Sequence, residues 1–142
     1  MIYFFDSSAL LKRYFNENGS AAVGQLINVC SDIYISDITK IECISVLRRY
    51  YYDRKITKEQ YIEFKNLMLE EFTHFKNIEV DSHLIYSAID FLDDRYLKSL
   101  DCIQFVSFST HVEKFSALVS CDNRLNQMAY SLNLTVLNPL EI

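Results

Sequence analysis

The chain has 142 residues, of which 50% are hydrophobic, and its formal net charge is −5. This length and apolar content suffice for one folded domain over residues 1–142 and exclude a disordered chain. The acidic balance argues against indiscriminate binding to nucleic acid, although it leaves room for a local basic patch. With only two glycines and one proline, the chain has no composition for a flexible linker or a repeat array.

The sequence also argues against a membrane protein and against a secreted protein held together by disulfides. No stretch approaches the roughly 20 apolar residues that span a bilayer, and the chain does not open with a basic region followed by an apolar run. Cys30, Cys43, Cys102 and Cys121 are scattered and form no CxxC pair. We therefore expect a cytoplasmic protein with reduced cysteines, no zinc site and no membrane segment.

The first half of the chain alternates short apolar runs with helical patterns. Residues 2–5 read IYFF and are typical of a buried strand. Residues 7–15 are typical of a helix with Ser7 or Ser8 as its N-cap. After the break at NENGS, the pattern predicts a helix over about 21–30, a strand over 32–36, a helix from Ser36 or Asp37 toward residue 55, and a helix to about 74 opened by the capping box of Thr57 and Gln60.

The second half continues the same alternation. It predicts a strand over 77–80, a helix capped by Asp81 or Ser82, a helix over 99–113, a strand over 116–121, a helix over about 123–132 and a last strand in LTVLNP. Short apolar strands that alternate with helices indicate an α/β fold. We expect three α/β/α layers around a central parallel sheet of four or five strands.

Two acids stand where predicted strands end. Asp6 follows the first strand, and Asp122 follows the fourth in ALVSCDNRL. The carboxyl ends of parallel strands share one edge of the sheet, where ligands of α/β proteins bind. Each residue could instead be an ordinary helix N-cap. If they act together, both side chains project from the same edge.

Two further acids lie on apolar flanks of predicted helices. Glu42 and Asp101 each have apolar residues four positions before and after them. A carboxylate rarely occupies such a place without a partner, because losing its hydration is costly. A helix cap near residue 100 would explain Asp101, and a salt bridge would explain either acid, with Arg48, Lys40 or Lys98 as the partner.

Considered together, the four carboxylates suggest a metal site. Their mutual repulsion in a poorly solvated cleft would require a positive partner. Oxygen ligands without a nearby histidine or cysteine favour Mg²⁺ or Mn²⁺ over zinc. Such an ion activates water and screens a phosphate, which suits hydrolysis of a phosphodiester bond.

Four blocks of the sequence carry a resemblance to a known family. FFDSSALLKRYFNENGS, ISDITKIECISVLRR, SLDCIQFVSF and ALVSCDNRLNQMAYSLNLTVLNP resemble the signature blocks of PIN-domain proteins, in particular the VapC-type toxins of toxin–antitoxin pairs. The resemblance covers Met1 to Pro139 and implies a Mg²⁺- or Mn²⁺-dependent endoribonuclease. It places the acidic quartet of the family on Asp6, Glu42, Asp101 and Asp122, and Ser120 at a position where relatives have Thr or Ser.

The resemblance also implies partners. Relatives usually form homodimers, cleave RNA and are blocked by a small antitoxin protein. One departure is Gln104, which replaces the histidine of the LDALH block common in relatives, and we expect this change to have little effect on activity. No acid follows Asp122 directly, which leaves the occupancy of a second metal open.

The hypothetical mechanism divides the roles among these residues. Asp6 and Asp101 would be the main metal ligands, Asp122 would complete the site directly or through water, and Glu42 would ligate the ion or orient the attacking water. Phosphates of the substrate would meet nearby basic residues, unless these are ordinary solvated helix charges. The candidates are Lys12, Arg13, Lys40 and Arg124, and Ser120 is a further candidate for binding the substrate.

Other functions remain open at this point. A haloacid-dehalogenase phosphatase would need an aspartate two residues after Asp6, where Ser8 stands, and the acidic pair and late lysine of a receiver domain are missing. The main alternative is a catalytically inactive PIN-like module that binds RNA or protein. The segment RRYYYDRK over 48–55 could stack on RNA or contact a partner, and we favour a partner.

Overall fold

The computed structural model describes residues 1–142 and contains one five-stranded sheet, in which all paired strands are parallel. The strand order is β3-β2-β1-β4-β5, so β1 lies in the centre. This confirms the predicted parallel sheet. The strands are β1 (Ile2–Phe5), β2 (Asp32–Ser36), β3 (Lys76–Ile78), β4 (Ala117–Val119) and β5 (Val136–Leu137).

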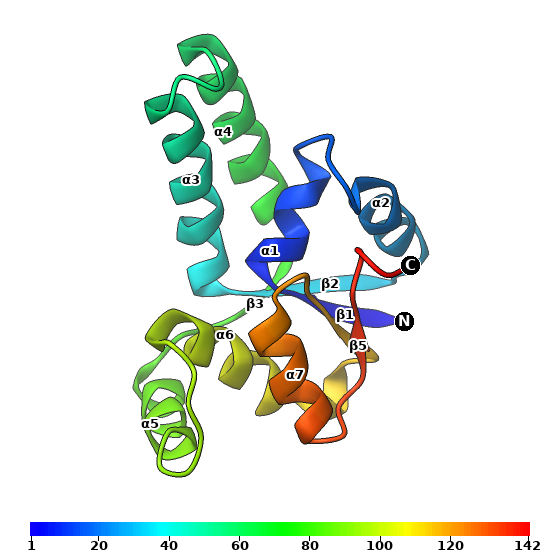
Figure 1. Cartoon of the computed structure of the whole chain (residues 1–142), viewed down its shortest axis with the longest axis vertical. Helices are drawn as coiled ribbons and strands as arrows, with labels where there is room; N and C mark the ends of the chain where they lie inside the picture. Colours follow the sequence, from blue (N-terminus) through cyan, green and yellow to red (C-terminus); the bar gives the residue numbers. More distant parts are fainter.

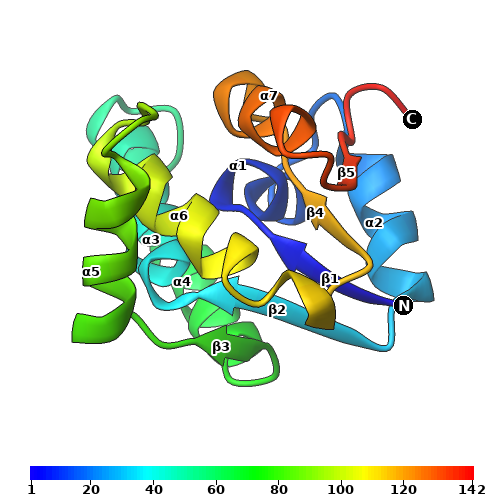
Figure 2. The same cartoon turned by 90° about the horizontal axis from the view of Figure 1, so that it is seen from below.

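Helices cover both faces of the sheet (Figure 1). Helices α1 to α4 lie on one face, and α5 to α7 lie on the other, in front of the sheet in Figure 2. No helix is long and apolar enough to cross a membrane. The helices are α1 (Ser7–Leu10), η1 (Leu11–Arg13, a 3₁₀ helix), α2 (Ser20–Val29), α3 (Asp37–Tyr52), α4 (Lys58–Phe72), α5 (Ser82–Phe91), α6 (Ser99–Ser109), η2 (Val112–Lys114, a 3₁₀ helix) and α7 (Asn123–Ser131).

The hydrophobic core is divided by the sheet into two clusters. Alternate residues of β1 serve different clusters, because side chains along a strand point to opposite faces. Tyr3 and Phe5 pack with α1–α4, whereas Phe4 packs with α5–α7. Burial of both sheet faces explains why the strands read as continuous apolar runs in the sequence.

Several predicted boundaries differ from the observed ones. The helix predicted over 7–15 is one α-helical turn followed by the 3₁₀ helix η1, and the helix predicted over 99–113 ends at Ser109 before η2. The predicted cap of α1 was also wrong, since Asp6 is the N-cap and its carboxylate accepts from the Ser8 N–H. The capping box of α4, with Thr57 and Gln60, is confirmed.

The arrangement fixes where a site can form. β1 and β4 are neighbours, and their carboxyl ends lie between the α3–α4 hairpin and α6 (Figure 1). The loops after these two strands open α1 and α7, while α3 follows directly from β2. The N-terminal ends of α1, α3 and α7 and the helix α6 therefore lie close together at the carboxyl edge of the sheet (Figure 1).

Candidate active site

Asp6 is the most deeply buried of the predicted acids, with 4% of its surface exposed. Its Oδ2 accepts from the Ser8 hydroxyl at 2.5 Å, from the Ser8 N–H at 3.2 Å and from the Ser120 hydroxyl at 3.4 Å. Burial raises the pKa of Asp6, the bonds from Ser8 oppose this rise, and the charge of Asp122 adds to it. The Oδ1 atom of Asp6 makes no hydrogen bond, so one carboxylate oxygen is left for a ligand.

Asp122 stands beside Asp6 because β4 pairs with β1. Its Oδ1 accepts from the N–H groups of Arg124 and Leu125 at 2.8 and 3.0 Å, and its own N–H donates to the Ser120 hydroxyl at 3.0 Å. Asp122 is therefore the N-cap of α7, as the simpler interpretation of the sequence predicted. Because only one of its oxygens caps the helix, that role does not prevent it from binding a ligand.

Glu42 comes to the site from the second turn of α3. Its Oε1 accepts from Nε2 of Gln104 at 2.6 Å, and the same nitrogen donates to the Thr39 hydroxyl at 2.7 Å. Burial raises the pKa of Glu42, the bond from Gln104 opposes this rise, and the charges of Asp6 and Asp101 add to it. No ion pair involves Glu42, so the salt bridge considered from the sequence is absent.

Asp101 lies in the first turn of α6 and is half-buried. Burial and the charge of Asp122 raise the pKa of Asp101, while the charges of Lys98 and Arg124 lower it. Neither cation is within the 4.0 Å of an ion pair. The N-cap of α6 is Lys98, so Asp101 does not cap its helix.

The four acids thus gather at one edge of the sheet from four different elements. The charges of neighbouring acids contribute to the raised pKa of three of them: Asp122 acts on Asp6 and on Asp101, and both Asp6 and Asp101 act on Glu42. In the conformation described, no three His, Cys, Asp or Glu side chains form a group that could hold a metal ion. Binding one ion through several carboxylates would therefore need side-chain movement. The all-oxygen donor set and its mutual repulsion suit a hard divalent cation.

The basic residues named from the sequence are divided between two places. Arg13 forms a bidentate ion pair with Glu71 of α4, at 2.9 and 2.8 Å, so its guanidinium is engaged away from the acids. Lys12 pairs with Glu17 at 3.1 Å, and Lys40 pairs with Asp37 at 3.6 Å. Of this group, only Arg124 acts on one of the four acids, and it does so together with Lys98.

Sequence reasoning did not identify the side chains that hold the acids in place. The Ser8 hydroxyl joins Asp6 to the N–H of Cys121 at 3.0 Å, which links the ends of β1 and β4. Gln104 is 1% exposed and connects α6 to Glu42 on α3. Its spacing was a usable signal, since a residue three positions after Asp101 lies on the same face of the helix.

A shallow hollow borders this cluster. It has a volume of about 290 Å³ and lies between α3 and α6, with Glu42 among its lining residues. Two exposed apolar side chains, Ile41 and Leu100, flank it. Of the four acids, Glu42 is therefore the one that this hollow exposes to solvent.

Solved structures with the same fold come from toxin–antitoxin complexes and toxins. The FitAB complex bound to an IR36 DNA fragment has a TM-score of 0.75, 13% identity and coverage of 100% of this chain and 97% of that chain. A toxin–antitoxin complex from Klebsiella pneumoniae has a TM-score of 0.69, 16% identity and coverage of 99% of both chains. VapC20 of Mycobacterium tuberculosis, a toxin that cleaves the sarcin–ricin loop, has a TM-score of 0.66, 14% identity and coverage of 89% and 94%.

At these identities the solved structures establish the fold alone. A comparison with curated proteins found no significant match. Four acids at the carboxyl edge of a parallel sheet define a class of α/β proteins with an acidic site at the strand ends. Within that class, residues 3–130 match the PIN domain family, and the chain belongs to this family.

Proposed function

We propose that this protein is a metal-dependent endoribonuclease and the toxin of a VapBC-type toxin–antitoxin pair. The observation that carries the proposal is the convergence of Asp6, Glu42, Asp101 and Asp122 at one sheet edge of a PIN domain. Helix capping accounts for one oxygen of Asp6 and one of Asp122, but no ion pair offsets the repulsion among the carboxylates. The free-energy cost of placing these carboxylates together would be offset if the site binds a cation.

The residues that would hold Mg²⁺ or Mn²⁺ are Asp6, Asp101 and Asp122, with Glu42 as a fourth ligand or as the group that orients the attacking water. When bound, the ion would activate water and stabilise the charge that develops on the leaving oxygen of the phosphodiester. Ser8 and Ser120 hold one oxygen of Asp6 in place, and Gln104 does the same for Glu42. These contacts orient Asp6 and Glu42 in the way that hydrogen-bond partners of metal ligands do.

Positive charge at the rim would receive the RNA backbone. Arg124 and Lys98 stand beside Asp101 without an ion-pair partner, so both are free to contact a phosphate next to the bond that is cleaved. Arg13 is less suited to this role than expected, because Glu71 accepts two hydrogen bonds from its guanidinium. Lys12 is also held by a partner, since it pairs with Glu17 and only 12% of its side chain is exposed.

The proposed partners follow from the family and from the solved structures. A homodimer of this chain would bind a small VapB-like antitoxin that covers the acidic site. Helices α3 and α4 expose Ile41, Tyr52, Ile62, Leu67 and Leu69, which offers apolar surface for such contacts. Two of the similar solved structures are complexes of toxin with antitoxin, which supports this part of the proposal.

The test is cleavage of total RNA by the purified protein with Mn²⁺, with Mg²⁺ and with EDTA. We expect cleavage only with a divalent ion, and a loss of at least a hundredfold in Asp6→Asn and Asp101→Asn. Glu113→Gln on η2 is the matched control, since it removes an acid outside the site. Full cleavage in EDTA, or full activity in both site variants, would contradict the proposal. A protein that binds RNA or antitoxin but never cleaves would instead be the inactive PIN-like module.

A further inference from the structure

A groove beside the acids is not explained by the metal site. It has a volume of about 470 Å³ and lies between α7 and the loop that joins α5 to α6. Four of its lining residues are spaced i, i+3, i+4 and i+7 along α7, so they form one face of that helix over about 10 Å. The lining residues are Tyr96, Leu97, Arg124, Gln127, Met128 and Ser131.

One end of the groove lies near the acidic cluster, although none of the four acids lines it. Arg124 lies at its end nearest the N-terminus of α7, where its charge acts on Asp101. Lys98, two residues after Tyr96, acts on Asp101 from the same loop. In a chain with a net charge of −5, two cations without ion-pair partners beside a carboxylate cluster indicate a local site for anions.

The side chains along the groove suit a nucleotide. Tyr96 is 74% exposed and makes no aromatic pair, so its ring is open for stacking. Leu97, the next residue, is buried and anchors the loop in the core cluster of α5–α7. Gln127 offers both a donor and an acceptor for the edge of a base. An aromatic platform next to cations is the common way to bind single-stranded RNA.

We propose that this groove binds an unpaired RNA nucleotide next to the bond that is cleaved, with the base stacked on Tyr96 and the phosphate held by Arg124 and Lys98. This inference rests on the proposed ribonuclease function and assigns one nucleotide of the substrate to this groove. A double helix could not place one base against Tyr96 without unpairing it.

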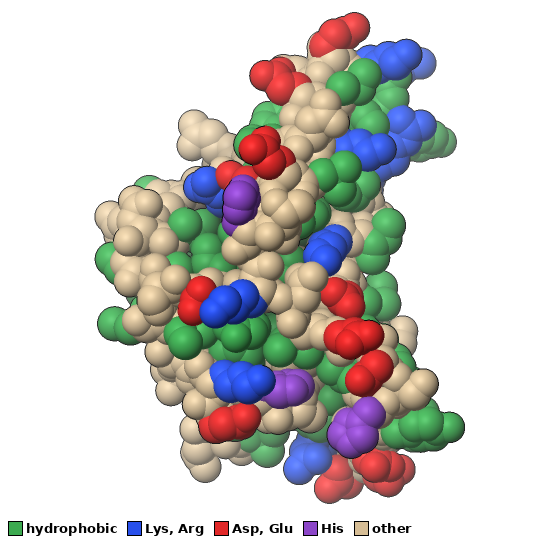
Figure 3. Space-filling view, turned by 180° about the vertical axis from the view of Figure 1, so that it is seen from behind, with side chains coloured by type: hydrophobic (Ala, Val, Ile, Leu, Met, Phe, Trp, Pro, Cys, Tyr) green, Lys and Arg blue, Asp and Glu red, His purple; other side chains and the backbone are tan.

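The opposite surface of the molecule does not offer the same combination. Figure 3 shows acidic side chains spread over the lower part of the rear face, on the side of α5, where they would repel an RNA backbone. The basic side chains of that face lie partly over the α3–α4 hairpin and partly at scattered positions below it, next to acidic ones. RNA that reaches the acids is therefore best held on the side of α7.

The experiment measures RNA binding without cleavage. Proteins in an Asp6→Asn background are titrated against fluorescein-labelled single-stranded RNA of about a dozen random nucleotides, in Mg²⁺, with anisotropy as the readout. We expect Tyr96→Ala to weaken binding about tenfold and Tyr96→Phe to restore it, because stacking needs the ring and not the hydroxyl. Arg124→Gln should lower the slope of log K against log salt by about 0.7.

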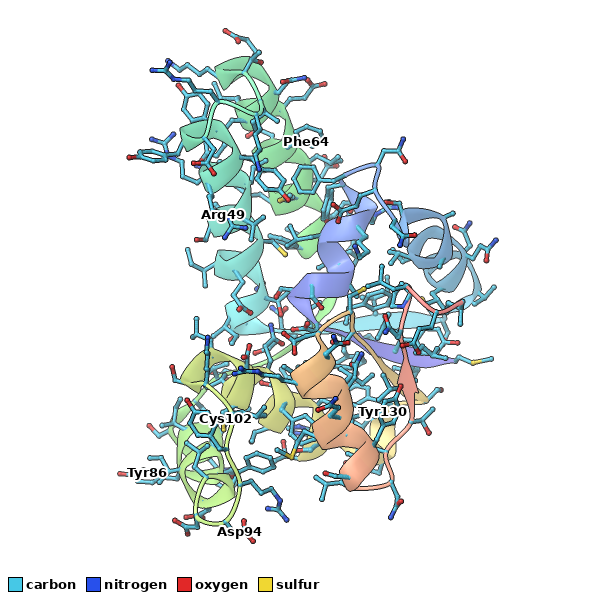
Figure 4. The ribbon with its side chains drawn as sticks, in the orientation of Figure 1. Arg49, Phe64, Tyr86, Asp94, Cys102 and Tyr130 are labelled. Carbon is cyan, nitrogen blue, oxygen red and sulfur yellow. The ribbon has the colours of Figure 1, made fainter.

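Tyr86→Ala is the matched control, since Tyr86 is 68% exposed and projects from the outer side of α5, away from α7 (Figure 4). It should leave the affinity unchanged, and duplex RNA should bind more weakly than single strands. Equal affinity of Tyr96→Ala and the parent, or an equal loss in Tyr86→Ala, would overturn the groove as the binding site. In those cases, RNA cleavage by the wild-type protein would leave the proposed function standing. Absence of both binding and cleavage would remove both proposals.

Discussion

Asp6 has a structural role that is compatible with the chemical role proposed for it. One of its oxygens caps α1 and accepts from Ser8, while the other makes no hydrogen bond. An aspartate is a good N-cap, and the cap holds its carboxylate on the rigid end of a central strand. Asp122 repeats this arrangement at the start of α7. The choice between a cap and a functional acid was therefore not a real alternative, because two oxygens allow both.

From the structure, we expect substitution of Gln104 to reduce metal affinity and RNA cleavage, whereas the sequence suggested little effect on activity. Gln104→Leu removes the N–H that donates to Glu42 while keeping a similar volume, so the carboxylate of Glu42 loses its fixed orientation. We expect Mn²⁺ affinity to fall about tenfold in calorimetry, as for other residues that orient metal ligands. RNA cleavage should fall mainly in kcat, with KM nearly unchanged.

Thr39→Val is the control for that substitution. It removes the acceptor of the second hydrogen of Gln104 but leaves the bond to Glu42 possible. We expect it to lower thermal stability without the loss of Mn²⁺ affinity. If Gln104→Leu changes only the melting temperature, Gln104 is a packing residue and has no role in positioning Glu42.

At the residue scale, the sequence predicted the four acids of the site but not the side chains that form hydrogen bonds with them. Asp6 and Asp122 follow strands, so the parallel order of the sheet brings them together, and the structure does so. The contact between Glu42 and Gln104 spans 62 residues and depends on how α3 packs against α6. The spacing from Asp101 shows which face of α6 Gln104 shares, but no local pattern shows that its partner is Glu42 on α3.

At the scale of elements, contacts with α4 hold the short helices α1 and η1 in position. Glu71 of α4 accepts from Arg13 and from the hydroxyl of Tyr14, at 2.9 Å. Tyr14 is buried, and its pKa is raised by burial and by the charge of Glu71. This cluster ties η1 to α4 and so supports the turn that begins at Asp6.

Glu71→Ala should therefore destabilise the fold. The change leaves a buried tyrosine hydroxyl without its acceptor and an arginine without its bidentate partner, which costs about 2 kcal/mol. Urea unfolding would measure the loss. Glu70→Ala is the control, because Glu70 is exposed and its side chain makes no bond. An equal effect in both variants would show that helix propensity, and not the cluster, accounts for the change.

The sequence predicted which segments form helices and which form strands, but it did not predict the residues at which several of them end. The alternation of apolar strands with helices gave the three layers, because each element must bury one side. The helix predicted over 7–15 shortened to α1 and η1, since the backbone changes there to 3₁₀ bonding, with the N–H of Tyr14 donating to the carbonyl of Leu11. Tertiary contacts such as those of Glu71 decide where such a helix stops, and they are not visible in a local pattern.

For the whole molecule, the acidic site is a source of instability when no cation is bound. Burial and mutual repulsion raise the pKa values of Asp6, Glu42 and Asp101, so the folded protein holds protons more tightly than the unfolded chain. Their contribution to stability is complete below the ordinary carboxyl pKa. It is lost as the pH rises through the raised values of the folded state. Glu71 acts in the opposite sense, since its pairing with Arg13 lowers its pKa.

This sign predicts how the melting temperature depends on pH and metal. In EDTA at neutral pH, Asp6→Asn should melt a few degrees higher than the wild type, because it removes a buried charge and keeps an acceptor for Ser8. The difference should shrink on acidification, as Asp6 of the wild type also becomes neutral. Mn²⁺ should then raise the melting temperature of the wild type more than that of the variant, since only the folded state gathers the carboxylates.

Thermal melts across pH, with and without Mn²⁺, separate this explanation from a general effect of charge. Asp90→Asn on α5 is the control, because it makes the same chemical change at an exposed position outside the site. Its melting temperature should follow the wild type at every pH and respond to Mn²⁺ in the same way. A stabilisation by Asp6→Asn that grows on acidification would mean that the carboxylate of Asp6 stabilises the fold. The four acids would then need a structural explanation.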